Sequence, residues 1–555
     1  MSNNDNASER DSYVGEIYCK GSDEMKRNVL STIKPEWSEL HTSGHIHIHD
    51  LEAYNLTYNC LTFDLLKSFP YEELSDGKTN QRAVLELFSY FRDIIVKTAN
   101  EQSGGMAFAN FDSDISSILN RIGMSNCDFS LVDDSIDMMI RWLSGAHERY
   151  GQVSFYVTLN IGLGTDEISR KVCRTVLKNF RDAGPRIIKP NIVFKVKKGI
   201  NLDEGDPNYD LYLLARSVTS KKMIPTYLLC DCELDREADP KVLSVMGCRT
   251  RVVDNVFGEK SSIGRGNLCN ITINLPRLAL ESKKSEDPWK TFVNKWNDVA
   301  STVKDILLDR YKHIISADPN NFPTIFEHNL WIGCPEKGLE NVFRNGTLAI
   351  GFIGLSDVFQ ILYEKPYYES DGLLLQALKF VEHMREYTDS LTKEYGLNFS
   401  LLATAGEMIS GRFPEIDSKL YDNDILKDRY YTNSFHVRVD NGMNPFDKIR
   451  FEGGFHKYCN GGCISYVELE SPPIGNEEAL DEMIRFAIDS GVHYLGFNFK
   501  LDVCDECGTT GIFDTCSECG SRAITRIRRV SGYLEELDHF TDGKKNEVKS
   551  RVVNG

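Results

Sequence analysis

The chain has 555 residues, of which 41% are hydrophobic and 26% charged, and its formal net charge is −18 at pH 7. This balance is typical of a soluble globular protein with one large body and smaller appendages, and the acidic charge disfavours broad binding to nucleic acids or membrane surfaces. No apolar run approaches the roughly 18 residues of a membrane helix, and the polar N-terminus has no apolar signal core, so we predict a cytoplasmic protein without stable nucleic-acid or membrane binding.

Amphipathic helices alternate with short β-like runs along most of the chain. Residues 81–97 carry apolar side chains at helical spacing, and residues 287–311 begin with Asp-Pro-Trp, an N-cap followed by a proline in the first turn. Residues 476–491 predict a helix closed by Gly491. Strands are predicted at 45–50, 153–162, 191–197, 270–275, 348–355 and 492–499. This alternation predicts an α/β body with a largely parallel sheet or barrel.

The composition changes after Lys500, where the sequence CDECGTTGIFDTCSECG contains two CxxC pairs. The four thiols belong to Cys504, Cys507, Cys516 and Cys519. Two CxxC turns can hold zinc tetrahedrally, and a glycine after each pair relieves the tight turn. The eight-residue spacer is short for a treble-clef finger but suits a zinc ribbon. Two redox CxxC motifs or a disulfide pair are the alternatives, and we favour a structural zinc ribbon. A closed four-thiolate site leaves no open position for catalysis by the metal.

A zinc ribbon alone is also typical of nucleic-acid-binding modules. The sequence RAITRIRR after the second CxxC pair supplies some basic residues, but the surrounding chain is acidic. The ribbon is therefore better interpreted together with the segment that follows it.

That segment, RRVSGYLEEL at residues 528–537, places a glycine just beyond the ribbon. A turn is the default interpretation of such a glycine. Followed by DGKKNEVKSRV, however, it resembles the C-terminus of the anaerobic (class III) ribonucleoside-triphosphate reductases, which are glycyl radical enzymes. Further segments resemble this family in order between about Gly44 and Arg551: GHIHIHDLEAYNLTYNCLTFD, FKVKKGINLDEGDPNYDLYLLA, MGCRTRV, RGNLCNITINLPRLAL, IGFIGLSDVF, YYTNSFHVRV and YCNGGCISYVEL.

The resemblance implies a ten-stranded α/β barrel of two parallel five-stranded halves, with a finger loop inside. We expect an N-terminal helical segment at 1–43, a catalytic barrel at 44–500, a zinc ribbon at 501–524, and a glycyl radical loop with the C-terminal tail at 525–555. The first segment is too short for the ATP-binding regulatory module, or ATP-cone, of many relatives. We therefore expect no overall on/off control by ATP and dATP.

Gly532 is the expected site of the radical, which the family installs with a separate S-adenosylmethionine-dependent iron–sulfur activase. A radical on an α-carbon is stabilised by the flanking amide nitrogen and carbonyl, and it needs a nearly planar centre that a β-carbon would crowd. Ser531 stands where relatives often have Cys or Thr. By resemblance, Cys248 in SVMGCRT carries the thiyl radical that takes the 3′-hydrogen of a ribose, and Cys60 in YNCLTFD faces it and supports reduction at the 2′-position. For either cysteine alone, a buried small apolar residue is the ordinary interpretation.

Asparagine and hydroxyl side chains are the expected substrate contacts. We expect Asn267 in RGN to handle the 2′ and 3′ hydroxyls, with Asn274 in INLP as the second candidate. For the triphosphate, the sequence YTNS offers hydroxyls, an amide and backbone donors. The residues concerned are Thr432, Asn433 and Ser434.

Two further segments are open to more than one interpretation. Gln102 in EQSGGMAF precedes a glycine pair that would let the backbone approach a ligand, and a plain loop explains it equally well. Cys459 and Cys463 in YCNGGC are candidates for extra redox roles, although buried structural thiols fit them better.

The run HIHIHD places three histidines, His45, His47 and His49, on one face of a predicted strand. Two of them could share a metal. The family has this segment as a barrel strand without a metal, and a polar strand face that lines a pocket explains the pattern, so we predict no metal here.

The implied reaction converts ribonucleoside triphosphates to 2′-deoxyribonucleoside triphosphates, with formate as the electron donor or a redoxin as in some branches. The implied assembly is a homodimer whose substrate specificity is set by dNTP and ATP effectors. Two alternatives stay open. Another glycyl radical enzyme, of the lyase or dehydratase type, usually lacks the four-cysteine ribbon and often has adjacent catalytic cysteines. A catalytically inactive zinc-ribbon barrel would not need Gly532, Cys248 and Cys60, which are all present.

Overall fold

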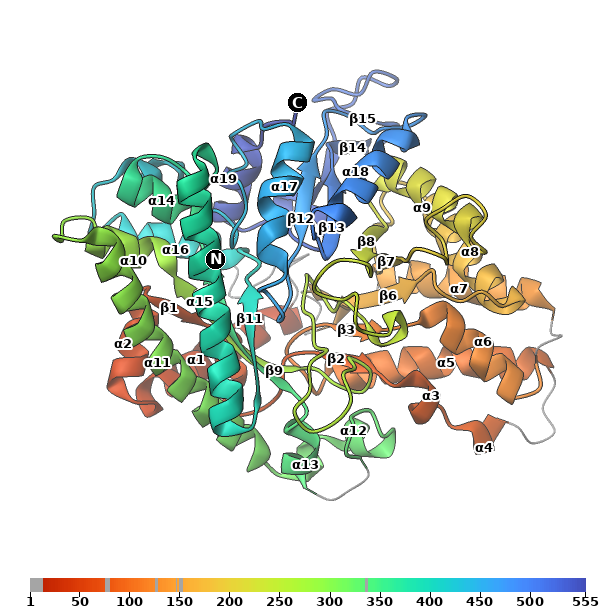
Figure 1. Ribbon diagram of the computed structural model, residues 1–555. Helices are drawn as coiled ribbons and strands as arrows, with labels where there is room; N and C mark the ends of the chain where they lie inside the picture. Colours follow the sequence, from red (N-terminus) through yellow and green to blue (C-terminus); the bar gives the residue numbers. More distant parts are fainter. Residues whose placement is uncertain (1–12, 75–79, 125–127, 146, 149–152, 335–337) are drawn as a thin grey trace.

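The computed structural model describes residues 13–74, 80–124, 128–145, 147–148, 153–334 and 338–555 (Figure 1). A seven-stranded and a four-stranded sheet form the body, and a second four-stranded sheet lies near the C-terminus. The short strands β4 (His147–Glu148) and β5 (Val153–Ser154) pair separately. Helices cover the sheets on the outside, as expected for an α/β protein.

The larger sheet has the strand order β12-β13-β8-β7-β6-β3-β2. Five of its strands are parallel: β2 (Leu61–Phe63), β3 (Met106–Phe108), β6 (Val157–Ile161), β7 (Asn191–Val196) and β8 (Thr226–Leu229). β13 (Tyr494–Asn498) pairs antiparallel with β8, and β12 (Ser465–Glu468) pairs parallel with β13. Every residue of β6 and β7 is buried, as is typical of parallel strands covered on both faces.

The second sheet has the order β1-β9-β10-β11. β9 (Asn267–Asn274), β10 (Thr347–Ile353) and β11 (Asn398–Ala403) are parallel to one another. β1 (Ile46–Ile48), from the histidine run, pairs antiparallel with β9 at the edge. It is therefore an added edge strand and belongs to neither parallel half.

Single bridges join the two sheets at both edges. Thr62 pairs antiparallel with Arg265, and Leu402 pairs parallel with Gly462 beside β12. The chain therefore first forms five parallel strands, β2, β3, β6, β7 and β8. The next five strands, β9 to β13, run in the opposite direction. The α/β class is confirmed. Among the described residues the ladders remain two sheets that meet at these bridges, and they do not form one continuous ring.

The predicted helices form where their apolar faces can be buried. α5 (Asn80–Ala99) buries the apolar side chains that recur at helical spacing in residues 81–97, namely Val84, Leu87, Phe88, Phe91, Ile94 and Ile95. α11 (Pro288–Ile315) begins with the predicted cap, because the Asp287 carboxylate accepts a hydrogen bond from the Lys290 amide at 3.0 Å. α18 (Glu477–Asp489) ends before Gly491, whose φ of +86° favours glycine.

The other longer helices are α1 (Tyr13–Thr32), α2 (Pro35–Thr42), α6 (Phe111–Arg121), α7 (Phe129–Gly145), α8 (Glu167–Asp182), α9 (Tyr209–Lys222), α10 (Leu275–Ser282), α14 (Leu355–Tyr363), α15 (Asp371–Tyr395), α16 (Met408–Asp417), α17 (Pro445–His456) and α19 (Asp542–Ser550). Within the described part of the chain, none of the helices has the length and apolarity that crossing a bilayer requires.

The C-terminal sheet has the order β15-β14-β16-β17, and all its pairs are antiparallel. β14 (Leu501–Cys504) and β15 (Thr510–Gly511) belong to the cysteine ribbon, whereas β16 (Ile524–Arg529) and β17 (Leu534–Glu536) form a hairpin. Gly532 lies at the hairpin tip, between Arg529 and Leu534, which pair across the ladder. The ribbon and the glycine loop therefore share one sheet.

Candidate functional site

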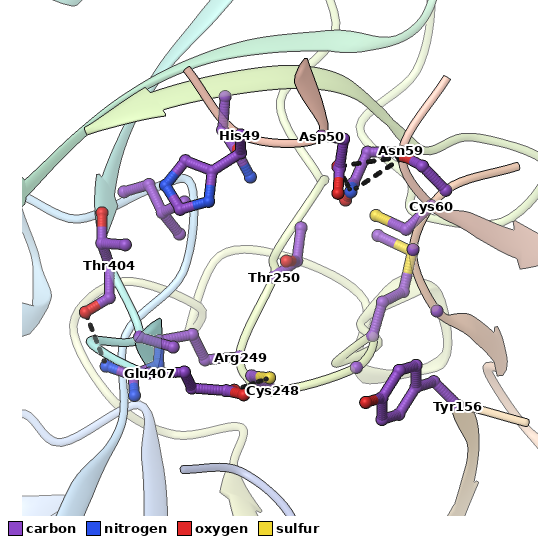
Figure 2. A pocket seen from close by; sticks show the side chains of 18 of the residues that line it. His49, Asp50, Asn59, Cys60, Tyr156, Cys248, Arg249, Thr250, Thr404 and Glu407 are labelled. Carbon is purple, nitrogen blue, oxygen red and sulfur yellow. Dashed lines mark hydrogen bonds between the residues drawn. The ribbon is translucent and has the colours of Figure 1, made fainter. Parts of the chain in front are cut away.

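A cavity of about 120 Å³ lies where the strands of the first parallel half begin and β11 of the second half ends. Its walls come from the segments before β2, β3 and β6, from β9, and from the turn between β11 and α16. The loop at residues 246–250, hereafter the finger loop, forms a further wall. Figure 2 shows Cys60 on one wall with its sulfur directed into the cavity, and Cys248 on a different wall with its sulfur beside the Glu407 carboxylate. The two thiols singled out in the sequence thus line one cavity.

Cys248 lies at the tip of a narrow loop. Met246 and Thr250 bridge each other by two backbone hydrogen bonds of 3.0 and 3.1 Å, so the chain reverses across Gly247 and Cys248. Gly247 has φ of +52°, a conformation that favours glycine. The glycine before the cysteine is therefore a turn residue, and it presents Cys248 to the cavity.

Gly532 lies directly against the backbone of Cys248. A β-carbon on Gly532 would lie 1.7 Å from the Cys248 carbonyl oxygen, so no side chain can be accommodated. Tyr533, the next residue, packs with Cys248 and Tyr156 in one apolar cluster. The hairpin tip and the finger loop, about 280 residues apart in sequence, meet at these two residues.

The Glu407 carboxylate joins both loops and lies in the turn between β11 and α16. Its Oε1 accepts hydrogen bonds from the Cys248 thiol at 3.2 Å and from the Ser531 hydroxyl at 2.9 Å. Its Oε2 accepts one from the Tyr533 phenol at 2.8 Å. Burial raises the pKa of Glu407, although these hydrogen bonds oppose the shift. The sequence motifs did not single out this residue, whose one signal is a carboxylate in the otherwise uncharged run LLATAGEMIS.

Both cysteines of the cavity are held as thiols. Burial, reinforced by the nearby Glu407 carboxylate, raises the pKa of Cys248 far above the ordinary thiol value. Burial raises the pKa of Cys60 to about 12. At neutral pH each sulfur therefore carries a hydrogen, which is the form that hydrogen-atom exchange needs.

A polar network borders Cys60. The Asn59 amide donates to the Asp50 carboxylate at 2.7 Å, and the Ser103 hydroxyl donates to the same oxygen at 3.0 Å. All three residues line the cavity. Gln102, predicted as a substrate contact, lies just outside it and donates to the Gly104 carbonyl at 3.2 Å.

The asparagine that β9 presents to the cavity is Asn270. Its Oδ1 is buried and has no hydrogen-bond partner among the described residues. Asn267 does not line the cavity, because its amide donates to Thr347. Nor does Asn274, which caps α10 by accepting a hydrogen bond from the Arg277 amide at 3.2 Å. The pairing of β9 with β10 shifts register between Asn267 and Cys269, so Asn267 lies beyond an irregularity that separates it from the regular part of the strand.

Thr432, Asn433 and Ser434 do not line this cavity either. The Thr432 amide and hydroxyl both donate to the buried Asp357 carboxylate, at 2.7 and 2.9 Å. The Asn433 side-chain oxygen Oδ1 accepts a hydrogen bond from the Gly406 backbone amide at 2.7 Å, beside Glu407. These polar groups therefore hold the wall of the cavity in place.

The N-terminus of α16 faces the cavity with Met408 and Ile409. The free backbone amides and the dipole of a helix N-terminus favour anions. The cavity therefore combines the two thiols with a helix N-terminus, a kind of site that suits a phosphate group.

The four ribbon cysteines form a cluster whose donor atoms all lie within 4.8 Å of one another. Cys504 and Cys519 are 3.5 Å apart at sulfur, as are Cys507 and Cys516. Four thiolates around zinc at about 2.3 Å would lie roughly 3.8 Å apart. The cluster could therefore hold zinc.

Three of the basic residues beyond the ribbon are paired or buried within the protein's own structure. Arg526 pairs with Asp514 and Arg528 with Asp502, both at 2.8 Å, and Arg529 is buried. Cys459 and Cys463 are buried and do not line the cavity; the Cys463 sulfur lies 3.2 Å from a nitrogen of His456.

The sequence matches the profile of the family described as anaerobic ribonucleoside-triphosphate reductase over residues 5–553. An anaerobic ribonucleoside-triphosphate reductase of Haemophilus influenzae is 31% identical, covering 95% of this chain and 79% of the relative. A solved anaerobic ribonucleotide reductase superposes with a TM-score of 0.74 at 16% identity, covering 97% of this chain and 88% of the other. The Thermotoga maritima anaerobic ribonucleotide reductase in complex with dATP and CTP gives a TM-score of 0.70 at 16% identity, covering 94% and 89%.

Proposed function

This chain belongs to the family of anaerobic ribonucleoside-triphosphate reductases, and we propose that it reduces its substrate through a radical stored on Gly532 and relayed by Cys248. It is an oxidoreductase that acts on ribonucleoside triphosphates. The comparisons favour this function over a lyase, a dehydratase or an inactive barrel.

The observation that carries the proposal is the contact between the hairpin tip and the finger loop. A radical on the Gly532 α-carbon takes the hydrogen atom of the Cys248 thiol, so that a C–H bond forms and a thiyl radical remains. The direct packing of the two residues and the hydrogen that the Cys248 sulfur keeps at neutral pH both support this step.

The thiyl radical would then take the 3′-hydrogen of the ribose, and after the reduction the Cys248 thiol would return this hydrogen to the 3′-carbon and become a thiyl radical again. The 2′-hydroxyl leaves as water, and formate supplies two electrons as it is oxidised to carbon dioxide; a redoxin is the alternative donor. Cys60 lies across the cavity, where it would support the reduction, and we propose Asn59 and Asn270 as the amides that hold the 2′ and 3′ hydroxyls. Asn270 lines the cavity, whereas the amide groups of Asn267 and Asn274 donate to Thr347 and Gly44 within the fold, and this placement supports the assignment of Asn270.

The nucleotide contacts are part of the same proposal. The N-terminus of α16 faces the cavity and would take phosphate, while the wall that contains Thr432, Asn433 and Ser434 supports it. We propose ribonucleoside triphosphates as substrates and dNTP or ATP as specificity effectors, in line with the dATP and CTP complex of the Thermotoga maritima protein. A homodimer and a cytoplasmic location are proposed from the sequence.

Zinc held by Cys504, Cys507, Cys516 and Cys519 would stiffen the base of the sheet whose other end is the hairpin tip. The metal would supply structure and no chemistry, because four thiolates leave it no open position. The radical would come from a separate S-adenosylmethionine-dependent iron–sulfur activase.

Electron paramagnetic resonance tests the proposal directly. Zinc-replete protein, incubated anaerobically with an activase and S-adenosylmethionine, should give the doublet of an α-carbon radical coupled to one hydrogen. Gly532→Ala should give none, and Ser531→Ala, which keeps the glycine, is the matched control. Nucleotide turnover is then measured in two reactions, one with formate and one with a reduced redoxin, by chromatographic separation of the dNTP products. The reaction that forms dNTP identifies the electron donor. No doublet from wild-type protein with an activase that works on a relative would contradict the proposal.

A further inference from the structure

Arg529, the last residue of β16, is a fully buried cation beside the radical position. Its side chain is 1% exposed. Nη1 donates to the Gly532 carbonyl oxygen at 3.3 Å, Nε donates to the Asn498 side-chain oxygen at 2.6 Å, and Nη2 donates to the Met223 carbonyl. The guanidinium is thus bound to the same glycine whose α-carbon packs against Cys248.

The charge of Arg529 is not neutralised by direct contact with an acid. Among the described residues it forms no ion pair with a carboxylate, and Glu468 reaches it only through Asn498, whose amide donates to that carboxylate at 2.6 Å. The neighbouring Arg528, in contrast, pairs with Asp502 at 2.8 Å. A buried cation without a counter-ion interacts strongly with the carbonyl dipoles that it contacts, since little water screens it.

The Gly532 carbonyl is half of the system that delocalises the radical. In the polar resonance form, the amide nitrogen gives electron density through the α-carbon to the carbonyl oxygen, which gains negative charge. A hydrogen bond from a cation to this oxygen becomes stronger as that charge grows. The stabilisation is therefore larger for the radical than for the intact glycine.

We propose that Arg529 stabilises the stored radical through the Gly532 carbonyl and thereby keeps the unpaired electron on glycine between turnovers. The inference rests on the proposed function. The affected equilibrium is the hydrogen-atom exchange between the two residues. In it, the Gly532 radical takes the hydrogen of the Cys248 thiol, which leaves an intact glycine and a thiyl radical. Loss of the cation shifts this exchange toward the thiyl radical, which is the more reactive and shorter-lived of the two.

The test uses the full chain with Arg529→Gln, which removes the charge, and Arg529→Lys, which keeps it on a different group. Arg528→Gln is the matched control, because Arg528 lies on the same strand, is also buried, and donates to the Leu501 and Ile527 carbonyls without contacting Gly532. Zinc content and circular dichroism establish that each variant is folded. Each protein is labelled with glycine carrying carbon-13 at the carbonyl.

After anaerobic activation, Arg529→Gln should hold about tenfold less radical per chain than the wild type, equivalent to about 1.4 kcal/mol. Its carbonyl carbon-13 splitting should also differ from that of the wild type, because less spin is drawn toward the oxygen. Arg529→Lys should give a radical content and a carbon-13 splitting between those of the wild type and Arg529→Gln. If Arg529→Gln does not fold, the comparison is made between the wild type and Arg529→Lys. Arg528→Gln should match the wild type in both measurements.

Equal radical content and equal carbon-13 splitting in wild type and Arg529 variants would overturn the inference and leave the proposed function standing. An equal loss in Arg528→Gln would also overturn it, because the effect would then follow from disturbing the hairpin. Absence of the doublet in the wild type would remove the radical proposal itself, and with it this role of Arg529.

Discussion

At the scale of single residues, Glu407 is the common acceptor for both loops that meet in the cavity. One of its oxygens accepts hydrogen bonds from the Cys248 thiol and the Ser531 hydroxyl, and the other accepts one from the Tyr533 phenol. A carboxylate binds such donors about twice as strongly as a neutral acceptor does. The distance between Gly532 and the Cys248 sulfur therefore depends on this one side chain.

We predict that Glu407→Gln slows hydrogen exchange between Gly532 and Cys248 by about tenfold, because a neutral amide of the same size holds the three donors less firmly. In deuterium oxide the thiol carries deuterium, so exchange replaces the glycyl α-hydrogen and collapses the doublet to a singlet. The rate of this collapse is the measurement. Glu415→Gln, on an outward-facing turn of α16, should not change it. An unchanged rate in Glu407→Gln would show that the carboxylate does not set the contact.

The raised pKa of Cys60 predicts its reactivity. With a pKa of about 12, roughly one sulfur in ten thousand is a thiolate at pH 8, against about one in ten for an ordinary thiol of pKa 9. Alkylation of Cys60 by iodoacetamide, followed by mass spectrometry, should therefore stay slow until the pH approaches 12. Since the folded pKa exceeds the unfolded one, the contribution of Cys60 to stability is full below about pH 9 and is lost as the pH rises toward 12. Fast alkylation of folded protein at pH 8 would contradict the buried thiol.

At the scale of elements, one antiparallel sheet connects the cysteine ribbon to the hairpin tip. β14 ends at Cys504 and pairs with β16, which leads to the tip. A ribbon this small has little apolar core of its own, so a metal would supply much of its stability. Disorder at the ribbon should then be transmitted along the strands to Gly532.

We predict that a chelator that strips zinc from the ribbon leaves the two large sheets folded but lowers radical formation at least tenfold, because the tip is no longer held against the finger loop. Circular dichroism should change little, hydrogen exchange over residues 501–536 should speed up, and the doublet should weaken. Cys507→Ser should behave in the same way, and Cys19→Ser, in α1, should not. Normal radical formation in zinc-free protein would show that the position of Gly532 does not depend on zinc at the ribbon.

A second contact fixes the tail behind the hairpin. α16 and α19 cross at Gly411 and Gly543, and a β-carbon on Gly543 would lie 2.3 Å from the Gly411 α-carbon. We predict that Gly543→Ala destabilises the docking of α19 by about 2 kcal/mol, since backbone cannot move aside as a side chain can. Gly21→Ala, in α1 with open space around it, should be neutral or slightly stabilising. Thermal unfolding and proteolysis of the tail measure both, and equal tolerance at the two positions would contradict the tight crossing.

At the scale of the whole molecule, much of the fold could be predicted, because helices such as α5 and α11 carry their own periodicity and caps. The ribbon and Gly532 could be identified because their spacing is local. The asparagine of the site could not, since Asn267, Asn270 and Asn274 lie within one strand and only its register decides which faces the cavity. Glu407 could not be identified for a similar reason: its partners come from two loops that are distant in sequence.

The assembly of three separate segments into one relay leads to the last prediction, which distinguishes storage of the radical from its use. Cys248→Ser replaces the relay thiol with a hydroxyl whose O–H bond is far stronger than S–H, so the glycyl radical cannot take its hydrogen. We expect the doublet to form and persist, no collapse in deuterium oxide, and dNTP formation lowered by at least about a thousandfold. Cys60→Ser should also abolish product but still allow the collapse, because Cys60 lies across the cavity and outside the contact with Gly532. Collapse in Cys248→Ser at the wild-type rate would mean that another group reaches the glycine, and the relay through the finger loop would have to be abandoned.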